Sequence, residues 1–533
     1  MPVSRHAAAK LVEEARAHAA RGNFANAERA FSKASIWPEA GEDVFLSWCD
    51  MHARRGEESE AEDVLRLGLS KLPTSRSLLL AYAELKRAFD LRDDSAKILQ
   101  HALKSWPDDM EFLGLAASVE AESGRDSLSL YRSIIEVSPN NPQAILGYVT
   151  ALHHSGRGND GAEYLARHVR RSPGWFDGLR ALGRLRLELG DGGKFADDFE
   201  QILKLSPRDP VLWATYLGIL ATGLKFDEVL QHLDRARSVL GPSTLLSMFE
   251  AQALSETGQS DQAEKLFRTL EPIEDQGFVP VRMRSLLRTG RACDAAQLGE
   301  RFVSQGPANF IWPLLGLAWR AAGDDRWRWL SQHDETVAAV SLGLSEKRLD
   351  EIGRFLRRLH ETSSQPYDQS LRGGSQTLGN LLDRTDPEIV DLRTAIREAV
   401  RHYIDSLPPV DRNHPFLRRD RGPFRFAGSW SVRLRDEGFH VPHIHPMGWI
   451  SSALYLALPE FEPVAGEEVT ANRAGWLALG ASPPELGLGL EPVKWIEPQV
   501  GRLALFPSIM WHETVPFPAG ERLSVAFDIV PFR

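Results

Sequence analysis

Apolar residues between the N-terminus and about residue 325 recur in paired stretches that have the period of amphipathic helices. Within a pair, a turn such as Gly22-Asn23-Phe24 or Gly258-Gln259-Ser260 separates the two stretches, and a proline follows the second. These prolines recur every 32 to 35 residues, at Pro38, Pro73, Pro107, Pro139, Pro173, Pro207 and Pro242. Because one helix pair cannot bury its apolar stripe alone, the pattern predicts an elongated stack of helix-turn-helix units.

The turns inside the pairs keep the same interval. They are marked by Gly22, Gly56, Gly124, Gly156, Gly190, Gly223, Gly258, Gly290 and Gly323, with Asp90 where a further glycine is expected. A period near 34 residues resembles that of tetratricopeptide repeats, so we expect about nine units over residues 1–325. The resemblance implies a superhelix whose concave face holds a protein or peptide partner. Self-association, or the spacing of another domain, remains an alternative role for the array.

Basic clusters on this array, such as Arg282, Arg284 and Arg288, could receive acidic segments of a partner, although a charge run is more often a solvated helix face.

The pattern of residues 326–420 predicts a helical connector with interruptions. The Ser-, Gln- and Gly-rich stretch from Ser363 to Thr377 is typical of a loop. Asp386-Pro387 opens a helix that Pro408-Pro409 ends. Its apolar stripe consists of Ile389, Leu392, Ile396, Val400, Tyr403 and Leu407.

The pattern changes again at about residue 421, where short alternating stretches predict strands. The expected strands are Ser429–Leu434, Trp449–Leu458, Gly475–Gly480, Gly501–Pro507 and Arg522–Val530, and a loop from His440 to Pro446 separates the first two. Short strands between Gly and Pro clusters favour an antiparallel sandwich or barrel over residues 421–533. The fold class is therefore multidomain α + β, with an all-α superhelix followed by a β-domain.

Three histidines of this β-domain are candidates for chemistry. His443 and His445 stand at i and i+2, so their side chains point to the same side of an extended segment. His512, from a distant strand, can complete a set of three imidazoles around one metal ion while other coordination positions stay open. Such an open site favours catalysis over a structural metal.

The ordered motifs around these histidines resemble the double-stranded β-helix, or jelly roll, of the iron(II)- and 2-oxoglutarate-dependent dioxygenases. More narrowly, they resemble a bacterial group of oxygenases fused to tetratricopeptide repeats. The motifs are Trp430-Ser-Val-Arg-Leu434, His443-Ile-His-Pro446, Gly448-Trp-Ile-Ser-Ser452, Phe506-Pro-Ser508, Trp511-His512 and Arg522-Leu-Ser524, together with the segment from Gln369 to Thr377.

The resemblance implies that His443, His445 and His512 hold Fe(II), which would also bind dioxygen and the cosubstrate 2-oxoglutarate. Arg522 would receive the far carboxylate of the cosubstrate, helped by Ser524 and, more weakly, by Tyr455. The implied activity is hydroxylation of a protein or peptide that the repeats recruit. Loops such as Phe461 to Asn472 and Ala481 to Glu497 would shape the substrate pocket.

The sequence departs from the superfamily pattern at His445, where an aspartate or glutamate ligand is usual. A neutral imidazole leaves the metal with more of its charge and alters its redox poise. Three carboxylates lie nearby in sequence, at Asp436, Glu437 and Glu513. Glu513 would face away from His512 on a strand, and Asp436 would require its loop to fold back.

Other interpretations remain open at this stage. Alternation along the last strand places Arg522 and Asp528 opposite the apolar residues, which alone would point Arg522 to water. Three histidines on iron also occur in cupin-type dioxygenases that use no 2-oxoglutarate, although here no glutamate follows His445 within a few residues. The domain could also be a degenerate, non-catalytic part of an interaction scaffold.

Composition narrows partners and location. A chain of 533 residues is too long for one core. Its formal net charge of −10 disfavours nucleic acid as a partner. The only cysteines, Cys49 and Cys293, exclude a disulfide framework and fit a reducing compartment. No segment approaches the ~20 apolar residues of a membrane span. We therefore predict a cytoplasmic protein without a membrane or nucleic-acid partner.

Overall fold

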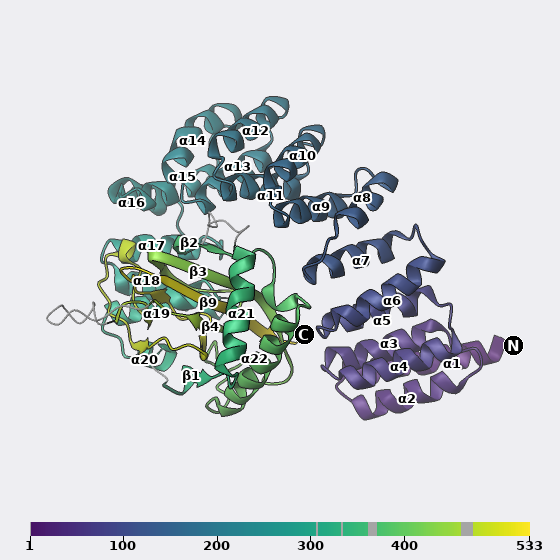
Figure 1. The fold of residues 1–533 in the computed structure, drawn as a ribbon. Coiled ribbons are helices and arrows are strands. Elements are labelled where there is room, and N and C mark those ends of the chain that lie inside the picture. Colours follow the sequence, from purple (N-terminus) through teal and green to yellow (C-terminus); the bar gives the residue numbers. More distant parts are fainter. Residues whose placement is uncertain (1, 305–307, 332–333, 361–369, 460–472, 533) are drawn as a thin grey trace.

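The computed structural model describes residues 2–304, 308–331, 334–360, 370–459 and 473–532. A helical array curves around a β-domain, passes over it at α8 to α16 and ends beside it at α17 to α20 (Figure 1). Among the predicted features, Gln369 and the loop from Phe461 to Asn472 lie outside the described residues. No helix within the described residues is long and apolar enough to cross a membrane.

Consecutive helices of the array form hairpins. The first ten helices are α1 (Pro2–Ala20), α2 (Phe24–Ile36), α3 (Glu42–Arg54), α4 (Glu58–Lys71), α5 (Arg76–Ala88), α6 (Arg92–Ser105), α7 (Met110–Glu122), α8 (Leu128–Val137), α9 (Pro142–His154) and α10 (Gly158–Arg171). They continue with α11 (Phe176–Glu188), α12 (Gly192–Leu205), α13 (Pro210–Thr222), α14 (Phe226–Leu240), α15 (Thr244–Glu256), α16 (Ser260–Thr269), α17 (Val279–Arg288), α18 (Ala292–Val303), α19 (Ile311–Ala321) and α20 (Arg326–Ser331). The described residues thus contain ten helix pairs, one more than the spacing predicted, because the short α20 completes a last pair.

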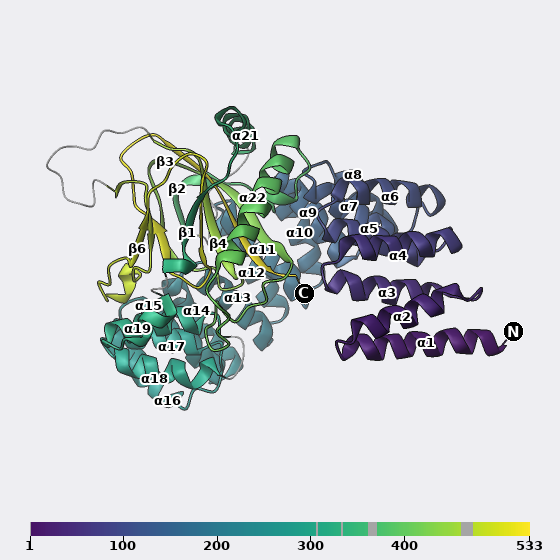
Figure 2. The same ribbon diagram turned by 90° about the horizontal axis from the view of Figure 1, so that it is seen from below.

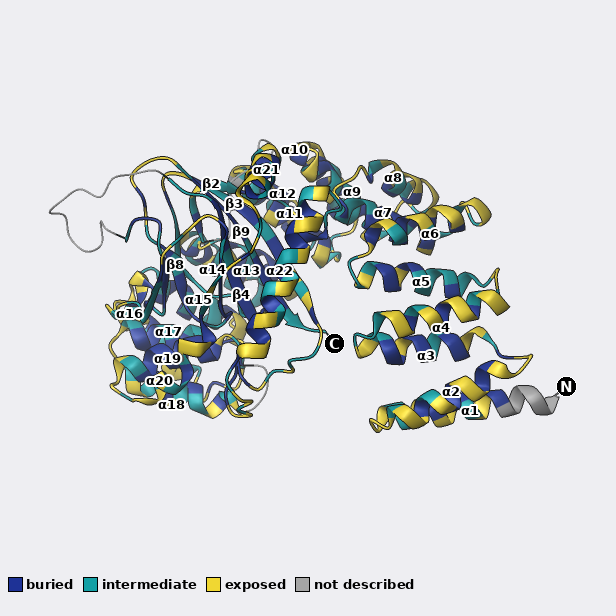
Figure 3. Ribbon diagram, turned by 60° about the horizontal axis from the view of Figure 1, so that its bottom comes forward, coloured by how far each residue is buried: buried dark blue, intermediate teal, exposed yellow. Residues whose placement is uncertain are grey.

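The turn inside each hairpin needs a residue with a left-handed backbone, which is why glycine recurs there. Gly22 has a φ of 75°, and Asp90, the predicted substitute for a glycine, has a φ of 65°. In one hairpin the prediction is wrong by one residue, because Leu224 and not Gly223 adopts the positive φ of 55°. Dark blue buried stripes of neighbouring helices face one another along the array (Figure 3).

Antiparallel strands build the β-domain, as predicted. They are β1 (Ala338–Ser341), β2 (Leu371–Gln376), β3 (Phe424–His443), β4 (Ile450–Ala457), β5 (Leu477–Leu479), β6 (Lys494–Ile496), β7 (Arg502–Pro507), β8 (His512–Thr514) and β9 (Glu521–Pro531). The order is β1-β7-β4-β9-β3-β8-β5-β6, and β2 pairs with β3. The sheet curls into a nearly closed jelly roll, with β3 and β9 along its length (Figure 1).

Four local predictions differ from the structure. The stretch predicted as a loop contains β2, which is a strand because Gly374 lets it approach β3 closely: a Cβ there would lie 2.4 Å from the carbonyl oxygen of Arg433. The connector also contributes β1, which pairs with β7 at the edge of the sheet. The predicted loop from His440 to Pro446 begins later, since β3 continues to His443. The predicted loop from Ala481 to Glu497 contains β6, which pairs with β5.

Helices α21 (Glu346–Leu359) and α22 (Pro387–Ser406) cover one face of the sheet. The predicted stripe of α22 is confirmed, since all six of its residues are buried in the core that the two helices share with β4, β7 and β9. The hydroxyl of Tyr403 also donates to the carbonyl oxygen of Thr336 at 2.6 Å. These helices therefore fix the sheet to the connector.

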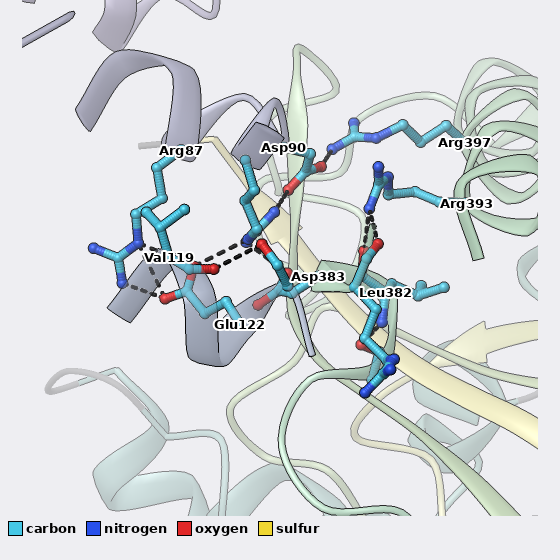
Figure 4. Close-up of polar contacts among 12 residues, drawn as sticks. Arg87, Asp90, Val119, Glu122, Leu382, Asp383, Arg393 and Arg397 are labelled. Atoms are coloured by element: carbon cyan, nitrogen blue, oxygen red, sulfur yellow. Dashed lines mark hydrogen bonds and ion pairs between the residues drawn. The ribbon is translucent and has the colours of Figure 1, made fainter. Parts of the chain in front are cut away.

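Within the described ranges, the array contacts the rest of the chain in two regions, and the first is centred on a cluster of charges around the buried Arg92 of α6. Its guanidinium pairs with Asp90 at 3.0 Å, with Glu122 at 3.0 Å and with Asp383, which follows β2, at 2.7 Å. Asp90 also pairs with Arg397 of α22. Figure 4 shows carboxylates from both halves of the chain converging on this point.

The second contact joins the last helices of the array to loops at one end of the sheet (Figure 2). Trp511 and Ile444 pack in the hydrophobic core of α15 to α20. The indole of Trp511 donates to the carbonyl oxygen of Pro313 at 3.1 Å, and the amide of Asn309 donates to that of Pro446 at 2.6 Å.

The basic cluster proposed as a partner site on α17 is already engaged. Arg282 binds Glu264 and Glu271. Arg284 binds Glu256 and Glu485, and Arg288 binds Glu256 and the carbonyl oxygen of Glu485. These arginines therefore stabilise the array and its contact with the β-domain.

We predict that Arg92→Met destabilises the protein, because it leaves three partly buried carboxylates without their shared cation. The expected loss is about 3–5 kcal/mol of unfolding free energy, measured by urea denaturation. Arg54→Met is the matched control, since Arg54 is 76% exposed and pairs only along its own helix with Asp50. That control should change the unfolding free energy by less than about 0.5 kcal/mol. Equal losses in the two variants would contradict the prediction.

Candidate metal centre

The structure brings the imidazoles of His443, His445 and His512 together at one end of the sheet. His443 is the last residue of β3 and pairs across the ladder with His512, the first residue of β8. His445 follows two residues later, and its backbone N–H donates to the carbonyl oxygen of Ser508 at 2.9 Å. One nitrogen from each ring lies within 4.8 Å of the corresponding nitrogens of the other two. That spacing suits three ligands of a single ion.

The hydrogen bonds of the rings leave one nitrogen of each available. Nδ1 of His443 donates to the carbonyl oxygen of Val441 at 2.8 Å, and Nδ1 of His512 donates to that of Met510 at 3.0 Å. A histidine with Nδ1–H engaged in this way presents its Nε2 lone pair to a metal. Burial lowers the pKa of His443 to about 3 and that of His512 well below its ordinary value, so both rings are neutral at pH 7.

A fourth histidine, His440, lies beside this group without joining it. Its ring stacks on that of His443, with 5.6 Å between the centroids, and Nδ1 hydrogen-bonds the hydroxyl of Ser370 at 2.9 Å. Burial lowers its pKa, and the positive charge of Arg522 adds to the effect. Arg522 is thus close enough to His440 to act on it electrostatically.

Arg522 points into the barrel and not to water, contrary to what strand alternation alone suggested. Its side chain is 2% exposed, and the guanidinium carbon lies 5.0 Å from the ring centroid of Tyr455, which is fully buried. Nη1 reaches the hydroxyl of Ser524 at a long 3.4 Å. The structure therefore groups the three residues that the resemblance assigned to the cosubstrate.

Among the described residues, no carboxylate pairs with Arg522. Its Nε and the hydroxyl of Tyr455 are buried polar atoms without a hydrogen-bond partner there. Burial lowers the pKa of Arg522 and raises that of Tyr455. A buried guanidinium is costly unless it meets an anion, so this pocket fits the carboxylate of a ligand.

The carboxylates considered as substitutes for the missing acidic ligand are placed elsewhere. Asp436 is exposed and accepts from the backbone N–H of Gly520, while Glu437 is exposed with a left-handed φ of 62°. Glu513 lies on β8 between two buried residues, so its side chain leaves the opposite face of the strand from His512. None of the three belongs to the histidine group among the described residues.

One carboxylate that was not predicted from the sequence does reach the site. Asp528 of β9 accepts a hydrogen bond from Nδ1 of His445 at 2.7 Å and another from the buried hydroxyl of Ser451. Its sequence signal is a single acidic residue within the otherwise apolar stretch from Val525 to Val530. Ser451 and Ser508 stood in the quoted motifs, but no role was assigned to them.

Comparison with protein families gives one match. Residues 428–528 match the model of a family described as "Putative 2OG-Fe(II) oxygenase". The matched segment includes His443, His445, His512 and Arg522. No curated protein sequence matches the chain.

Several solved structures are similar to parts of the chain. A prolyl-4-hydroxylase from Pseudomonas putida is 20% identical, with a TM-score of 0.26, over 40% of this chain and 98% of that chain. A tetratricopeptide repeat protein from Parabacteroides merdae is 15% identical, with a TM-score of 0.28, over 44% of this chain and 94% of that chain. A Pseudomonas aeruginosa protein, pilF, is 15% identical, with a TM-score of 0.30, over 41% of this chain and 98% of that chain.

The three imidazoles, the buried guanidinium and the jelly roll that holds them thus agree with the family comparison. Over residues 428–528 the chain carries a domain of the family of 2-oxoglutarate- and iron(II)-dependent oxygenases, and this domain follows an array of tetratricopeptide-like repeats.

Proposed function

We propose that the protein is an iron(II)- and 2-oxoglutarate-dependent hydroxylase that acts in the cytoplasm on a protein or peptide recruited by its repeats. The observation that carries the proposal is the buried Arg522, which has no carboxylate partner among the described residues and lies in the same jelly roll as the group of three imidazoles. A dicarboxylic acid that reaches both the metal and the guanidinium would supply the missing anion.

The residues of the chain have distinct tasks in this proposal. His443, His445 and His512 would hold Fe(II), which supplies the oxidising chemistry with dioxygen and 2-oxoglutarate when these are bound. Arg522 and Ser524 would bind the distal carboxylate, and the hydroxyl of Tyr455 would donate to the same group. The buried ring of Phe506, 4.8 Å from that of His512, keeps water from this side of the site.

The alternatives make different predictions. A cupin-type three-histidine enzyme would consume oxygen without 2-oxoglutarate, whereas a scaffold would bind neither Fe(II) nor the cosubstrate. The proposed function is supported over both by the grouping of Arg522, Ser524 and Tyr455, since neither alternative requires a buried cation inside the barrel.

We expect the purified protein to convert 2-oxoglutarate to succinate slowly without a substrate, in an Fe(II)-dependent reaction that consumes oxygen. His512→Ala should lower this turnover at least about 100-fold, because it removes a ligand donated by a rigid strand. His402→Ala, on α22 and outside the histidine group, is the matched control. Oxygen consumption that persists without 2-oxoglutarate would favour the cupin-type reaction. A folded wild-type protein that shows no turnover even when Fe(II) is added would favour the scaffold.

Arg522→Met should have opposite effects on stability and on binding. Without ligand it removes a buried charge that lacks a partner, so we expect the unfolding free energy to rise by about 1–3 kcal/mol. The affinity for 2-oxoglutarate, measured by fluorescence titration, should fall roughly 100-fold. The same substitution at Arg92, which has three carboxylate partners, is predicted to destabilise the protein. A large loss of stability at Arg522 would show that the guanidinium already has a partner in the ligand-free protein.

A groove on the inner face of the array is our candidate for the recruitment of the substrate protein. Its volume is about 440 Å³, and it lies between α11 and α13, which face the β-domain while α12 and α14 lie outside (Figure 1). Its lining includes Arg180, Arg184, Val211, Thr215, Gly218 and Thr222. Val211 is 49% exposed although apolar, and the two arginines are exposed on one side of α11.

This lining suits an extended peptide with an apolar side chain, which would pack against Val211. The inner face continues from α13 to α19, where Asn309 and Pro313 contact the loops that carry the histidines. A bound segment that follows this face therefore leads toward the proposed metal site.

Gly218→Leu should obstruct the groove while leaving the chemistry intact. A Cβ at Gly218 has only Phe249 near it, at 4.0 Å, and leucine favours a helix over glycine, so the fold should tolerate the change. In cells that express the wild type, we expect a substrate protein whose mass is increased by one oxygen atom. This mass increase should disappear with Gly218→Leu, while succinate formation by the purified variant is unchanged. Gly193→Leu, on the outer helix α12 with open space around it, should preserve the mass increase. Retention of the mass increase in Gly218→Leu would exclude the groove as the recruitment site.

A further inference from the structure

The three histidines differ in what holds their second ring nitrogen. His443 and His512 each donate to the carbonyl oxygen of the residue two positions earlier in the chain. His445 alone donates to a carboxylate, that of Asp528, at 2.7 Å. His445 is also the position where the oxygenase superfamily usually has an acidic ligand. In this chain the carboxylate therefore does not stand at the ligand position itself; it belongs to Asp528, which accepts a hydrogen bond from the ligand His445.

Hydrogen bonds from neighbouring serines fix the position of the Asp528 carboxylate. The hydroxyl of Ser451, on β4, donates to the same carboxylate oxygen that His445 contacts. Because this hydroxyl has only one proton, the hydroxyl of Ser508, 2.9 Å away, must donate to Ser451 in turn. Ser451 and Ser508 are both fully buried. The chain of donors holds the carboxylate in one orientation.

The packing over this group leaves no room for a further side chain. A Cβ added at Gly448 would lie 2.5 Å from the hydroxyl oxygen of Ser508 and 3.2 Å from Cβ of Asp528. Gly448 lies two residues before β4 and in the same turn as His445, whose carbonyl oxygen accepts its backbone N–H at 3.0 Å. The glycine thus lets the ligand loop close over the carboxylate.

Asp528 also lacks a permanent counter-charge. Its side chain is 12% exposed, and within the described part of the chain no lysine or arginine forms an ion pair with it. A carboxylate buried in this way is costly unless a positive charge lies within reach. A divalent metal on the other nitrogen of His445 would provide that charge through the ring.

We propose that Asp528 is a positioning residue that acts through His445, fixing its Nδ1–H tautomer and delivering to the metal the negative charge that an acidic ligand would otherwise supply. The inference rests on the proposed function, because it takes the three histidines as ligands. Ser451 and Ser508 orient the carboxylate for this task. Together they place one carboxylate beside a ligand set that consists of three histidines.

The test uses the full-length protein and Co²⁺ alone as the probe, so that it does not depend on turnover. Anaerobic titration should give a Co²⁺ affinity about 10- to 100-fold weaker for Asp528→Asn than for the wild type. Asparagine keeps the size and one acceptor oxygen, so this variant isolates the charge. Asp528→Ala should weaken binding further, and Ser451→Ala should have an intermediate effect. Glu513→Gln, which removes a carboxylate next to His512 on the opposite face of β8, should stay within about twofold of the wild type.

A second measurement separates positioning from simple stabilisation of the fold. Long-range ¹H–¹⁵N spectra of the metal-free protein with labelled histidine should show the Nδ1–H tautomer of His445 in the wild type and in Asp528→Asn. A mixture of tautomers is expected in Asp528→Ala, while the signals of His443 and His512 remain unchanged. If the ring of His445 keeps one tautomer in Asp528→Ala, the positioning role is overturned.

Failure of the inference and failure of the proposed function give different results. If the wild type binds Co²⁺ with no loss of affinity in His512→Ala, the histidines are not the ligands and the proposed function fails. If His512→Ala abolishes binding while Asp528→Asn binds as tightly as the wild type, the metal site stands and the role of Asp528 is excluded.

Discussion

The barrel interior contains two charged side chains whose counter-charges are not provided by the described residues: the guanidinium of Arg522 and the carboxylate of Asp528. Burying either one costs several kcal/mol unless an opposite charge arrives. Their order along β9 places the cation deep in the barrel and the anion behind a histidine near its mouth. The two charges can therefore be neutralised by different ligands: a dicarboxylate can pair with Arg522, and a metal cation bound to His445 can balance the charge of Asp528.

The helical array does more than lie beside this domain. It is joined to the connector by a charge cluster around Arg92 and to the mouth of the barrel by a shared apolar core. The first junction involves the early repeats and the second involves the last ones, so the array spans the β-domain between two fixed points (Figure 1). The inner groove between α11 and α13 lies on the part of the arc between those points.

The repeat array could be predicted from sequence because each unit depends only on its neighbours, and the 34-residue interval records that local rule. The helix that begins at Pro387 was equally clear from its caps and its apolar stripe. The three histidines could be found because two stand at i and i+2 at the end of a strand and the third begins a strand. In each case the information lies within a short segment.

Features that depend on distant packing could not be predicted in this way. Arg522 and Asp528 share the polar side of β9, which alternation alone assigns to water; they are buried because that side lines a closed barrel. Strands β1 and β2 were missed because their pairing partners lie far away in sequence. The partnership of Asp528 with His445 required the register between β9 and β4, which a single sequence does not specify.

Ile444 stands between two of the proposed ligands, yet its side chain belongs to the hydrophobic core of the last repeats. Replacing a repeat therefore has different structural consequences at the two ends of the array. Replacement of units near the N-terminus would disturb the Arg92 cluster and the neighbouring contacts of Phe89 with Phe532 and of Arg125 with Thr385, whereas the final units have to be inherited together with the histidine loop. The structural border between the repeats and the β-domain thus runs through the array itself, ahead of its last hairpins.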